Sequence, residues 1–437
     1  MNRRAFLAKS ACALSGIAAP SIVRASAFGA NAPSNRINVG FIGTGRQAFG
    51  ANLPQMMAVP GVQVVTVCDV DSWRLGEAQN FVNAFYTRRD GLASYNGCAK
   101  SSDFREVIAD SNIDALMVST PDHWHVPIGI MAAKAKKHFA MEKPISLSVE
   151  QGRMLSDAVK LSGVTVRNDS EFRSLRVQNH AVELIRNGHL GKLERIEIVF
   201  PSDPTPVGVQ PDMPVPPELN YDMWLGPTAM VPYTQKRVHT PKSYDRPGWM
   251  RHRYYCDGMI TNWGAHLNDV AQWGNNTDRT GPIEVEAQGT YPPADSFWNV
   301  LLKFEAAYRF ANGVRMFYKT DEKVYVRFEG SEGWIFAEYQ KPLQAEPAAV
   351  LGSKIGDNEI HFPFKSDKQD FIDAVKTRGD TLEGAEVGHR TTSLCHLANI
   401  AIQVGKKLEW DPAKERFANS PEANAFVDKW IQASRRS

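Results

Sequence analysis

A glycine-rich turn follows a short apolar stretch near the start of the sequence. Ile37–Ile42 has the composition of a buried strand, and residues 43–48 follow it with G-x-G-x-x-A spacing. In dinucleotide-binding folds the first glycine permits a tight turn and the second lets the backbone approach a pyrophosphate. The N-terminus of the next helix then offers free N–H groups to the phosphates. We therefore expect a dinucleotide cofactor that contacts Gly43, Thr44, Gly45, Arg46 and Gln47.

An acidic residue, Asp69, follows the second β-branched stretch at residues 62–67. At this distance from the turn, a carboxylate accepts hydrogen bonds from the hydroxyls of the adenosine ribose. A carboxylate repels a 2′-phosphate, so we expect NAD in preference to NADP. Arg74 lies close in sequence and could soften this preference, which leaves NADP open.

Two further apolar stretches end in polar motifs. Residues 113–120 lead into Pro121-Asp122-His123-Trp124-His125, and residues 138–141 end in Glu142-Lys143-Pro144. The carboxyl ends of parallel strands form the edge where such sheets bind ligands. A lysine beside a positively charged nicotinamide ring gives up its proton more readily and can exchange it with a substrate hydroxyl. We expect cofactor contacts from Thr120, Pro121, His125, Glu142 and Lys143.

The order of the motifs resembles that of the Gfo/Idh/MocA family, named after glucose–fructose oxidoreductase and inositol dehydrogenase. The resemblance rests on residues 120–125, 142–144, 224–227, 262–269 and 328–334, and it covers essentially the whole chain after the leader. It implies a Rossmann domain followed by an α/β domain with a large open sheet. The free face of that sheet often builds an oligomer, so we expect a dimer or tetramer through the C-terminal sheet.

The resemblance also implies a catalytic pair. Lys143 matches the family's usual acid/base lysine, while Asn262 and His266 match an Asp-x-x-x-His motif whose side chains share a helix face. An amide can position a hydroxyl but cannot act as a base, which places the proton chemistry on Lys143 and His266. Substrate contacts are expected from Trp124, Arg173, Asn262, Trp263 and His266. Trp124 could instead pack under the nicotinamide.

A proline- and aromatic-rich excursion, residues 203–248, suggests the substrate class. Tyrosine and tryptophan faces stack on sugar rings, and Arg251, His252 and Arg253 could bind hydroxyls or a carboxylate. A small carbohydrate is therefore expected, although the same segment could wrap a neighbouring subunit instead.

The N-terminal segment resembles a twin-arginine export signal. Asn2-Arg3-Arg4-Ala5-Phe6-Leu7 precedes a short apolar run and the small residues Ala25-Ser26-Ala27. The apolar run is too short for a stable membrane anchor. We expect a signal peptide over residues 1–27, a linker over 28–36 and export to the periplasm by the twin-arginine machinery. Because that machinery carries folded proteins, the cofactor is expected to travel tightly bound.

The 437 residues suit two domains. Strands alternating with helices predict a doubly wound parallel sheet, an N-terminal Rossmann domain over residues 37–165. Residues 166–437 are expected to form the C-terminal α/β domain with a large, open, mostly antiparallel sheet. Its predicted strands are residues 195–200, 283–290, 297–305, 314–319 and 324–329, and residues 367–407 read as two helices.

The composition argues against other classes. Net charge is +2, and the first 27 residues hold four basic residues and no acid, so the basicity gives no sign of nucleic-acid binding. Five widely spaced cysteines suggest neither a zinc site nor a disulfide framework, and no metal is expected. The preferred function is an exported NAD(P)-dependent oxidoreductase acting on a secondary hydroxyl of a sugar, glycoside or cyclitol.

Two enzymatic alternatives and one non-catalytic alternative stay open. A redox-neutral glycosidase would oxidise, eliminate and re-reduce its substrate, and a hydride shuttle would act between two sugars. The third alternative is a sugar-binding protein without catalysis, against which the intact Gly43, Gly45, Asp69 and Lys143 argue.

Overall fold

The computed structural model describes residues 36–428. The expected signal peptide and all but the last residue of the expected linker lie outside the described residues.

The N-terminal sheet contains six strands in the order β3-β2-β1-β4-β5-β6, all of them parallel. The order reverses between β1 and β4, and this is the position at which doubly wound sheets bind ligands. The predicted parallel sheet is therefore confirmed. Its strands are β1 (Ile37–Ile42), β2 (Val62–Cys68), β3 (Ala99–Ser101), β4 (Ala115–Val118), β5 (His138–Glu142) and β6 (Val166–Asp169).

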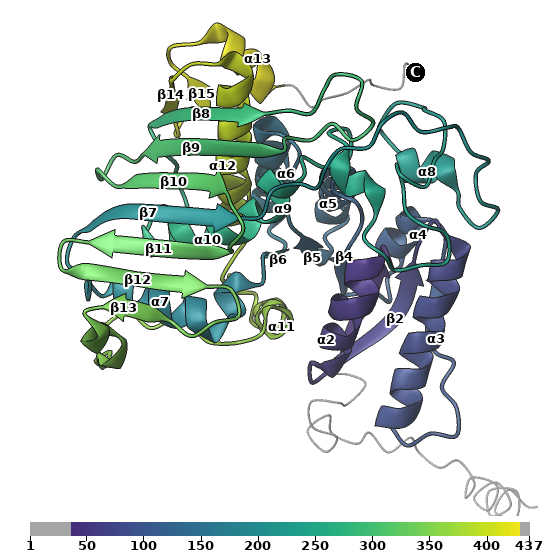
Figure 1. The fold of residues 1–437 in the computed structure, drawn as a ribbon. Helices are drawn as coiled ribbons and strands as arrows, with labels where there is room; N and C mark the ends of the chain where they lie inside the picture. The colour runs from purple at the N-terminus through teal and green to yellow at the C-terminus, as the bar shows by residue number, and fades with distance from the viewer. Residues whose placement is uncertain (1–35, 429–437) are drawn as a thin grey trace, which may run out of the picture.

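Helices cover both faces of this sheet. One apolar cluster joins the sheet to α2 (Leu53–Ala58), α3 (Ser72–Arg89) and α11 (Asp367–Thr377). A second cluster, on the other face, includes α4 (Phe104–Ala109), α5 (His125–Lys134) and α6 (Val149–Ser162). The chain thus returns to the N-terminal domain for α11, which lies between the two sheets in Figure 1. The N-terminal unit therefore includes β6 and α11, beyond the expected boundary at residue 165.

The second sheet contains nine strands in the order β13-β12-β11-β7-β10-β9-β8-β14-β15. Only the β7–β10 pair is parallel, so the expected open, mostly antiparallel sheet is confirmed. Its strands are β7 (Leu193–Phe200), β8 (Glu284–Thr290), β9 (Lys303–Arg309), β10 (Arg315–Thr320), β11 (Tyr325–Gly330), β12 (Gly333–Glu338), β13 (Gln344–Glu346), β14 (Leu408–Asp411) and β15 (Arg416–Phe417).

The strand predicted over residues 297–305 begins only at Lys303. The N–H of Phe297 donates to Val207 and that of Asn299 to Arg251. Because these backbone groups bond to the segment before α9 (Met259–Asn262), this stretch cannot pair along its length with a neighbouring strand.

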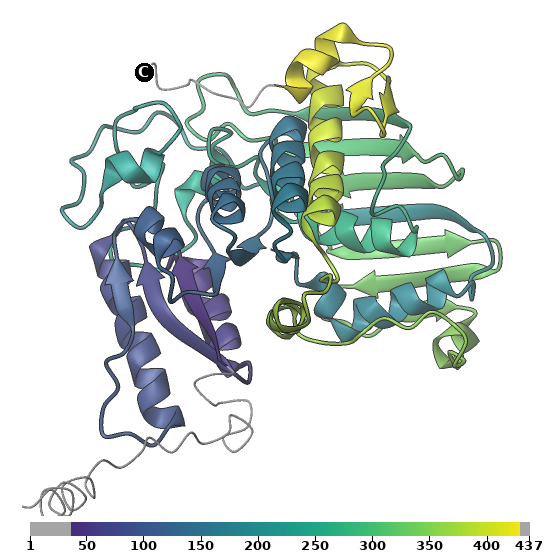
Figure 2. The ribbon, with the colours of Figure 1, turned by 180° about the vertical axis from the view of Figure 1, so that it is seen from behind.

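Three helices pack on one face of the nine-stranded sheet (Figures 1 and 2). They are α7 (Arg176–Arg186), α10 (Gly264–Gly274) and α12 (Ala385–Val404), and α13 (Pro421–Val427) packs at the end of α12. The two helices predicted within residues 367–407 are α11 and α12. Among the described helices, none combines the length and apolar character needed to cross a membrane.

The predicted excursion is an ordered segment that docks on the Rossmann domain. We call residues 201–258, between β7 and α9 (Met259–Asn262), the strap. Its backbone bonds to the end of β2: Asn220 N–H donates to Val70 O at 2.9 Å, and Ser72 N–H donates to Glu218 O at 2.8 Å. The strap carries α8 (Tyr221–Leu225), which lies above α4 in Figure 1.

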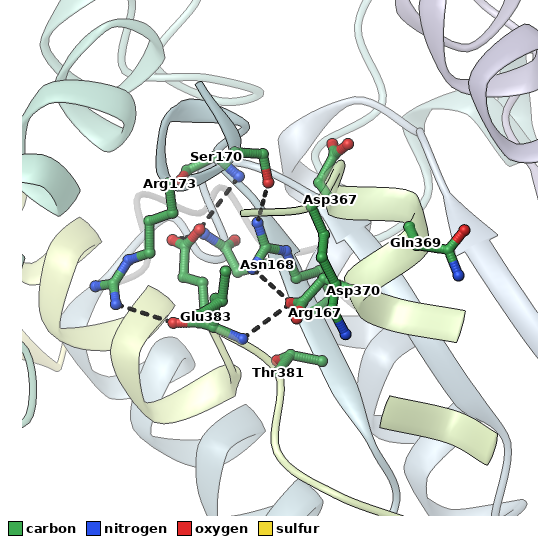
Figure 3. Close-up of polar contacts among 12 residues, drawn as sticks. Arg167, Asn168, Ser170, Arg173, Asp367, Gln369, Asp370, Thr381 and Glu383 are labelled. Atoms are coloured by element: carbon green, nitrogen blue, oxygen red, sulfur yellow. Dashed lines mark hydrogen bonds and ion pairs between the residues drawn. The ribbon is translucent and has the colours of Figure 1, made fainter. Parts of the chain in front are cut away.

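A buried polar network fastens β6 to α11 (Figure 3). Arg167 is fully buried and forms an ion pair with Asp370 of α11 at 2.9 Å. Lys368, also fully buried, forms ion pairs with Asp169 and Asp367. Removing one partner of a buried ion pair typically costs about 3–5 kcal/mol, because the other charge stays buried. The network therefore fixes the end of β6 beside the carboxyl end of β5.

Candidate active site

A cavity of about 220 Å³ lies at the carboxyl edge of the Rossmann sheet, between the loops after β1, β2, β4 and β5 and the strap. Most of the predicted site residues line it: Gly43, Gly45, Arg46, Gln47, Asp69, Thr120, Pro121, Trp124, Glu142, Lys143 and Asn262. Thr44, His125, Arg173, Trp263 and His266 are not among the residues that line it.

The glycine turn has the shape of a phosphate cradle. Gly43 has φ +88°, and a Cβ there would lie 2.6 Å from the carbonyl oxygen of Ser119, so only glycine fits. At Gly45 the nearest atom to a Cβ would be Arg74 Nη1, 4.0 Å away, which leaves the backbone open toward the cavity. A dinucleotide pyrophosphate fits this arrangement.

The helix that follows the turn contains a π-helical segment, Ala48–Asn52. Such segments are frequent at functional sites. Here it places the Asn52 side chain so that Nδ2 donates to Glu142 Oε1 at 2.8 Å and to Ser119 Oγ at 2.9 Å. The ends of β4 and β5 are thereby held to the turn.

Asp69 is held in place from both sides. Its Oδ2 accepts hydrogen bonds from Thr44 N at 2.7 Å and Thr44 Oγ1 at 2.9 Å, and its Oδ1 accepts one from Asp71 N at 2.9 Å. Thr44 is fully buried and orients this carboxylate. The guanidinium of Arg74 pairs with Asp71 and donates to Ser243 O at 2.6 Å, so it is already engaged within the protein.

Lys143 stands at the end of β5, next to the buried Glu142. His125, expected to touch the cofactor, instead bridges two loops behind the cavity wall. Its Nδ1 lies 2.8 Å from Pro144 O and its Nε2 lies 3.0 Å from Thr120 O. Burial lowers the pKa of His125, although both carbonyl contacts oppose this shift. The ring therefore joins the lysine loop to the loop after β4.

His266 is buried, and its Nδ1 bonds to the carbonyl of Ser170. Its ring also stacks on Phe172, with centroids 4.8 Å apart. Burial, and then the positive charge of Lys143, lower the pKa of His266 to about 3, while the bond to Ser170 opposes them. The imidazole is therefore neutral, with its proton on Nδ1, and Nε2 can act only as an acceptor.

The helix that was expected to carry Asn262 and His266 on one face is interrupted between them. α9 ends at Asn262 and α10 begins at Gly264. Consequently Asn262 lines the cavity, whereas Trp263 packs against Tyr339, with ring centroids 5.4 Å apart.

Arg173, an expected substrate contact, does not line the cavity. Its guanidinium is buried and forms ion pairs with Asp269 at 2.6 Å and Asp278 at 3.1 Å, and it donates to Leu382 O at 2.9 Å. The guanidinium is therefore fully engaged with partners inside the protein. Figure 3 shows its contact with the chain beside Glu383. The sequence showed the charge but not the distant carboxylates that neutralise it.

Asp122, which was not among the expected site residues, lines the cavity and is 5% exposed. Burial raises the pKa of its carboxyl group to about 7. The motif around it was recognised, but nothing in the sequence shows that this carboxyl group is buried. In the same turn, the predicted contact Trp124 lines the cavity, with Nε1 donating to Trp224 O at 3.1 Å.

The strap's share of the cavity was also missed. Its composition predicted order but not the surface on which it docks. The lining residues it supplies are Met223, Trp224, His239, Asp245, Arg246, Pro247, Trp249 and Met250.

Within residues 36–428, no group of three or more His, Cys, Asp or Glu side chains is arranged so that it could hold a metal ion. The cysteines at 68, 98, 256 and 395 are free and buried.

Two family models match the sequence. One, described as the NAD-binding Rossmann fold of an oxidoreductase family, matches residues 37–170, and the other, the C-terminal α/β domain of that oxidoreductase family, matches residues 207–436. The chain belongs to the Gfo/Idh/MocA oxidoreductase family. The resemblance seen in its motifs is thereby confirmed, and the turn at Gly43 and Gly45 is the dinucleotide cradle of a Gfo/Idh/MocA Rossmann domain.

Curated relatives match less than half of this Gfo/Idh/MocA chain. A glycosyl hydrolase family 109 protein of Shewanella woodyi is 27% identical over 165 residues, which cover 38% of this chain and 34% of that protein. An uncharacterized oxidoreductase of Rhizobium meliloti is 28% identical over 164 residues, covering 38% and 45%. The chain thus spans less than half the length of these relatives.

Solved structures share the whole fold. An aldose–aldose oxidoreductase from Caulobacter crescentus superposes with a TM-score of 0.62 at 16% identity, covering 86% of this chain and 99% of that one. A levoglucosan dehydrogenase in complex with NADH and L-sorbose gives a TM-score of 0.58 at 18% identity, covering 86% and 98%.

Proposed function

We propose that this Gfo/Idh/MocA protein is an NAD-dependent oxidoreductase acting on a secondary hydroxyl of a sugar, glycoside or cyclitol. The observation that carries this proposal is that Lys143 and Asn262 line the same cavity as the phosphate cradle. The names of structural neighbours that act on sugars, the levoglucosan dehydrogenase and the aldose–aldose oxidoreductase, favour a carbohydrate substrate.

Each residue has a separate task in this proposal. Gly43, Gly45 and Asp69 hold the phosphates and ribose of the dinucleotide, which supplies a hydride acceptor and donor when bound. Lys143 exchanges the proton of the substrate hydroxyl. Asn262 orients that hydroxyl through its amide. His266 does not line the cavity, and its Nδ1 proton is held by Ser170, so we assign it the positioning of neighbouring groups rather than proton donation to the substrate.

We further propose that NAD is favoured over NADP and stays bound between turnovers. Asp69 disfavours a 2′-phosphate, and Arg74, which follows it at the start of α3, is tied to Asp71 and the strap. Residues of the strap line one side of the cavity, and the backbone of the strap is hydrogen-bonded to the Rossmann domain just after β2. A covered site slows exchange of whatever it encloses.

A retained cofactor favours a second candidate, a redox-neutral cycle in which the cofactor is restored within each turnover. Glycosyl hydrolase family 109 names among the relatives suit a glycosidase that oxidises, eliminates and re-reduces. A hydride shuttle between two sugars is a further form of the same cycle.

The test is to purify the protein, record its absorbance at the nicotinamide band and identify any released dinucleotide. Bound NAD that resists dialysis supports retention. Aldoses, cyclitols and 4-nitrophenyl glycosides are then supplied one at a time. Absorbance of NADH supports a dehydrogenase, whereas nitrophenol release without net NADH supports the redox-neutral cycle. Sugar binding with neither cofactor nor turnover would contradict both and favour a non-catalytic binding protein.

Export through the twin-arginine machinery to the periplasm is a separate proposal that rests on Arg3 and Arg4. Changing both to lysine should leave the unprocessed precursor in the cytoplasm, as detected by fractionation and immunoblotting. Normal export of the double variant would contradict it.

We also propose a homo-oligomer through the free face of the nine-stranded sheet. That face carries aromatic side chains under arginines, such as Phe317 below Arg195 and Arg315, and Trp334 below Arg327. Analytical ultracentrifugation of the wild type and of Phe317→Glu tests this oligomer. We expect the wild type to sediment as an oligomer and the variant to dissociate, and a monomeric wild type would contradict the proposal.

A further inference from the structure

Asp122 is a buried carboxyl group in the wall of the cavity. It begins the short 3₁₀ turn Asp122–Trp124 that follows β4. Its Oδ2 has no hydrogen-bond partner among the described residues. Buried polar atoms are nearly always paired in native proteins, so each exception calls for an explanation. In a cavity wall, a carboxyl oxygen without a partner is suited to receive a hydrogen from a ligand.

Charged and titratable groups from two neighbouring elements surround this carboxyl. Lys143 and Glu142 approach from the end of β5, and Cys256 and Asp257 approach from the strap. Burial raises the pKa of Asp122 to about 7, and the two acids add to the rise, while the Cys256 thiol and Lys143 oppose it. Both protonation states are therefore populated near neutral pH, where a carboxyl group can accept a proton and return it.

We propose that Asp122 is a second proton-transfer group of this active site, acting on the carbon next to the hydroxyl that Lys143 serves. The inference rests on the proposed oxidoreductase function and deepens it. Oxidising a hydroxyl needs one proton-exchanging group, and Lys143 fills that role. A second group is needed only if the oxidised sugar reacts further, and Asn262 cannot fill it because an amide does not exchange protons at neutral pH.

The second step is an elimination beside the new carbonyl. The carbonyl acidifies the C–H bond of the neighbouring carbon. The Asp122 carboxylate takes that proton, and the C–H electron pair forms a C=C bond. The C–O bond to the substituent on the next carbon breaks, and the departing oxygen keeps its electron pair and takes a proton from water. The hydroxide left from that water adds to the carbon that lost the substituent. The C=C electron pair then takes the proton back from Asp122, or a deuteron in D2O, which regenerates the carboxylate. The substrate class is therefore a sugar with a leaving substituent, such as a glycoside.

The experiment uses the holoprotein with 4-nitrophenyl and methyl glycosides in D2O. Recovered sugar is examined by NMR and mass spectrometry for deuterium on the carbon next to the oxidised position, and nicotinamide absorbance is followed in a single turnover. Wild type should incorporate deuterium. Asp122→Asn should lose about 100-fold or more of the incorporation rate, the range expected for a missing proton-transfer group, which is a much larger loss than that of its oxidation rate.

Asp203→Asn is the matched control. Asp203 is a buried carboxylate too, but it belongs to the strap, and burial raises its pKa to about 6. It bonds to Met259 N and pairs with Arg251, and it is not among the residues lining the cavity. This variant should incorporate deuterium like wild type.

A readout independent of turnover is the infrared carboxyl band in D2O. Asp122→Asn should remove one band that titrates near pH 7 in the wild-type protein.

Three results would overturn the assignment of Asp122. They are full deuterium incorporation by Asp122→Asn, oxidation without any incorporation by wild type, and equal loss of oxidation and incorporation in a folded Asp122→Asn protein. Failure of wild type to oxidise any sugar would instead contradict the proposed function, and this inference with it.

Discussion

Asp71 and His239 form a buried pair that joins the Rossmann domain to the strap, with Nε2 of the histidine 3.0 Å from Oδ2 of the aspartate. Asp71 also caps α3, because its Oδ1 accepts hydrogen bonds from the N–H groups of Trp73 and Arg74. Burial alone would raise the pKa of Asp71, but the bonds from His239 and from the Arg74 backbone outweigh it and lower the pKa. The strap is thereby fastened at the end of the cavity where Asp69 lies.

Replacing His239 with alanine should speed the release of bound dinucleotide. A hydrogen bond to a charged group is worth about 1.5–3 kcal/mol, so release should quicken by roughly one to two orders of magnitude. Stopped-flow displacement of NADH fluorescence measures the rate. His361→Ala, an exposed histidine outside the strap, is the control. An unchanged release rate would show that the strap does not limit exchange.

Asp69→Ser should weaken NAD binding and improve NADP binding relative to it. The variant loses the carboxylate that Thr44 and Asp71 orient, and with it about 1–3 kcal/mol of hydrogen bonding to the ribose hydroxyls. Isothermal titration with both dinucleotides measures the change. Equal NAD affinity in the variant and wild type would remove Asp69 from the cofactor site.

Lys143→Ala should leave the fold and the bound dinucleotide in place while slowing oxidation of the hydroxyl. A positioned acid/base group typically contributes about 10²–10⁴-fold in rate. Single-turnover absorbance with a confirmed substrate gives the rate, and substrate affinity should change far less. Retention of more than about a tenth of the wild-type rate would contradict the acid/base role.

Asp122→Asn should stabilise the apoprotein in a pH-dependent way. The pKa of Asp122 is raised to about 7 when folded, against about 3.9 in an unfolded chain, so the folded state keeps a proton that the unfolded state has released. Wild type therefore loses stability as pH rises from about 4 to 7. The variant lacks this loss, on the order of a few kcal/mol. Its gain in Tm should grow across that range and stay level above it.

The parallel sheet could be predicted because its strands are continuous apolar runs, and each run is followed directly in the sequence by the turn or polar motif that ends it. Gly43, Gly45 and Asp69 line the cavity as their spacing indicated. Strand β12 was not predicted. It follows β11 after a turn of only two residues, so in the sequence the two strands look like one apolar segment. Their antiparallel pairing, which local composition does not show, makes them two strands.

The expected site residues that do not line the cavity share one physical cause. Arg173 is neutralised by Asp269, which lies 96 residues further along the chain, and His125 is held by Pro144. A charged or aromatic side chain looks the same in sequence whether it faces a ligand or a partner in the fold. Only the tertiary structure reveals the partner, and for the same reason the buried carboxyl group of Asp122 went unnoticed.

The position of α11 delays the completion of the nucleotide domain during synthesis. Phe371, Ile372 and Val375 fill the core beneath β1 and β2, yet the ribosome makes them after seven of the nine strands of the second sheet. The nascent nucleotide domain must therefore wait with an uncovered apolar face while the second sheet is translated, and such faces attract chaperones and aggregation. Only a chain that extends through α11 can close that face, so a premature stop before residue 367 leaves the apolar face of the nucleotide domain uncovered.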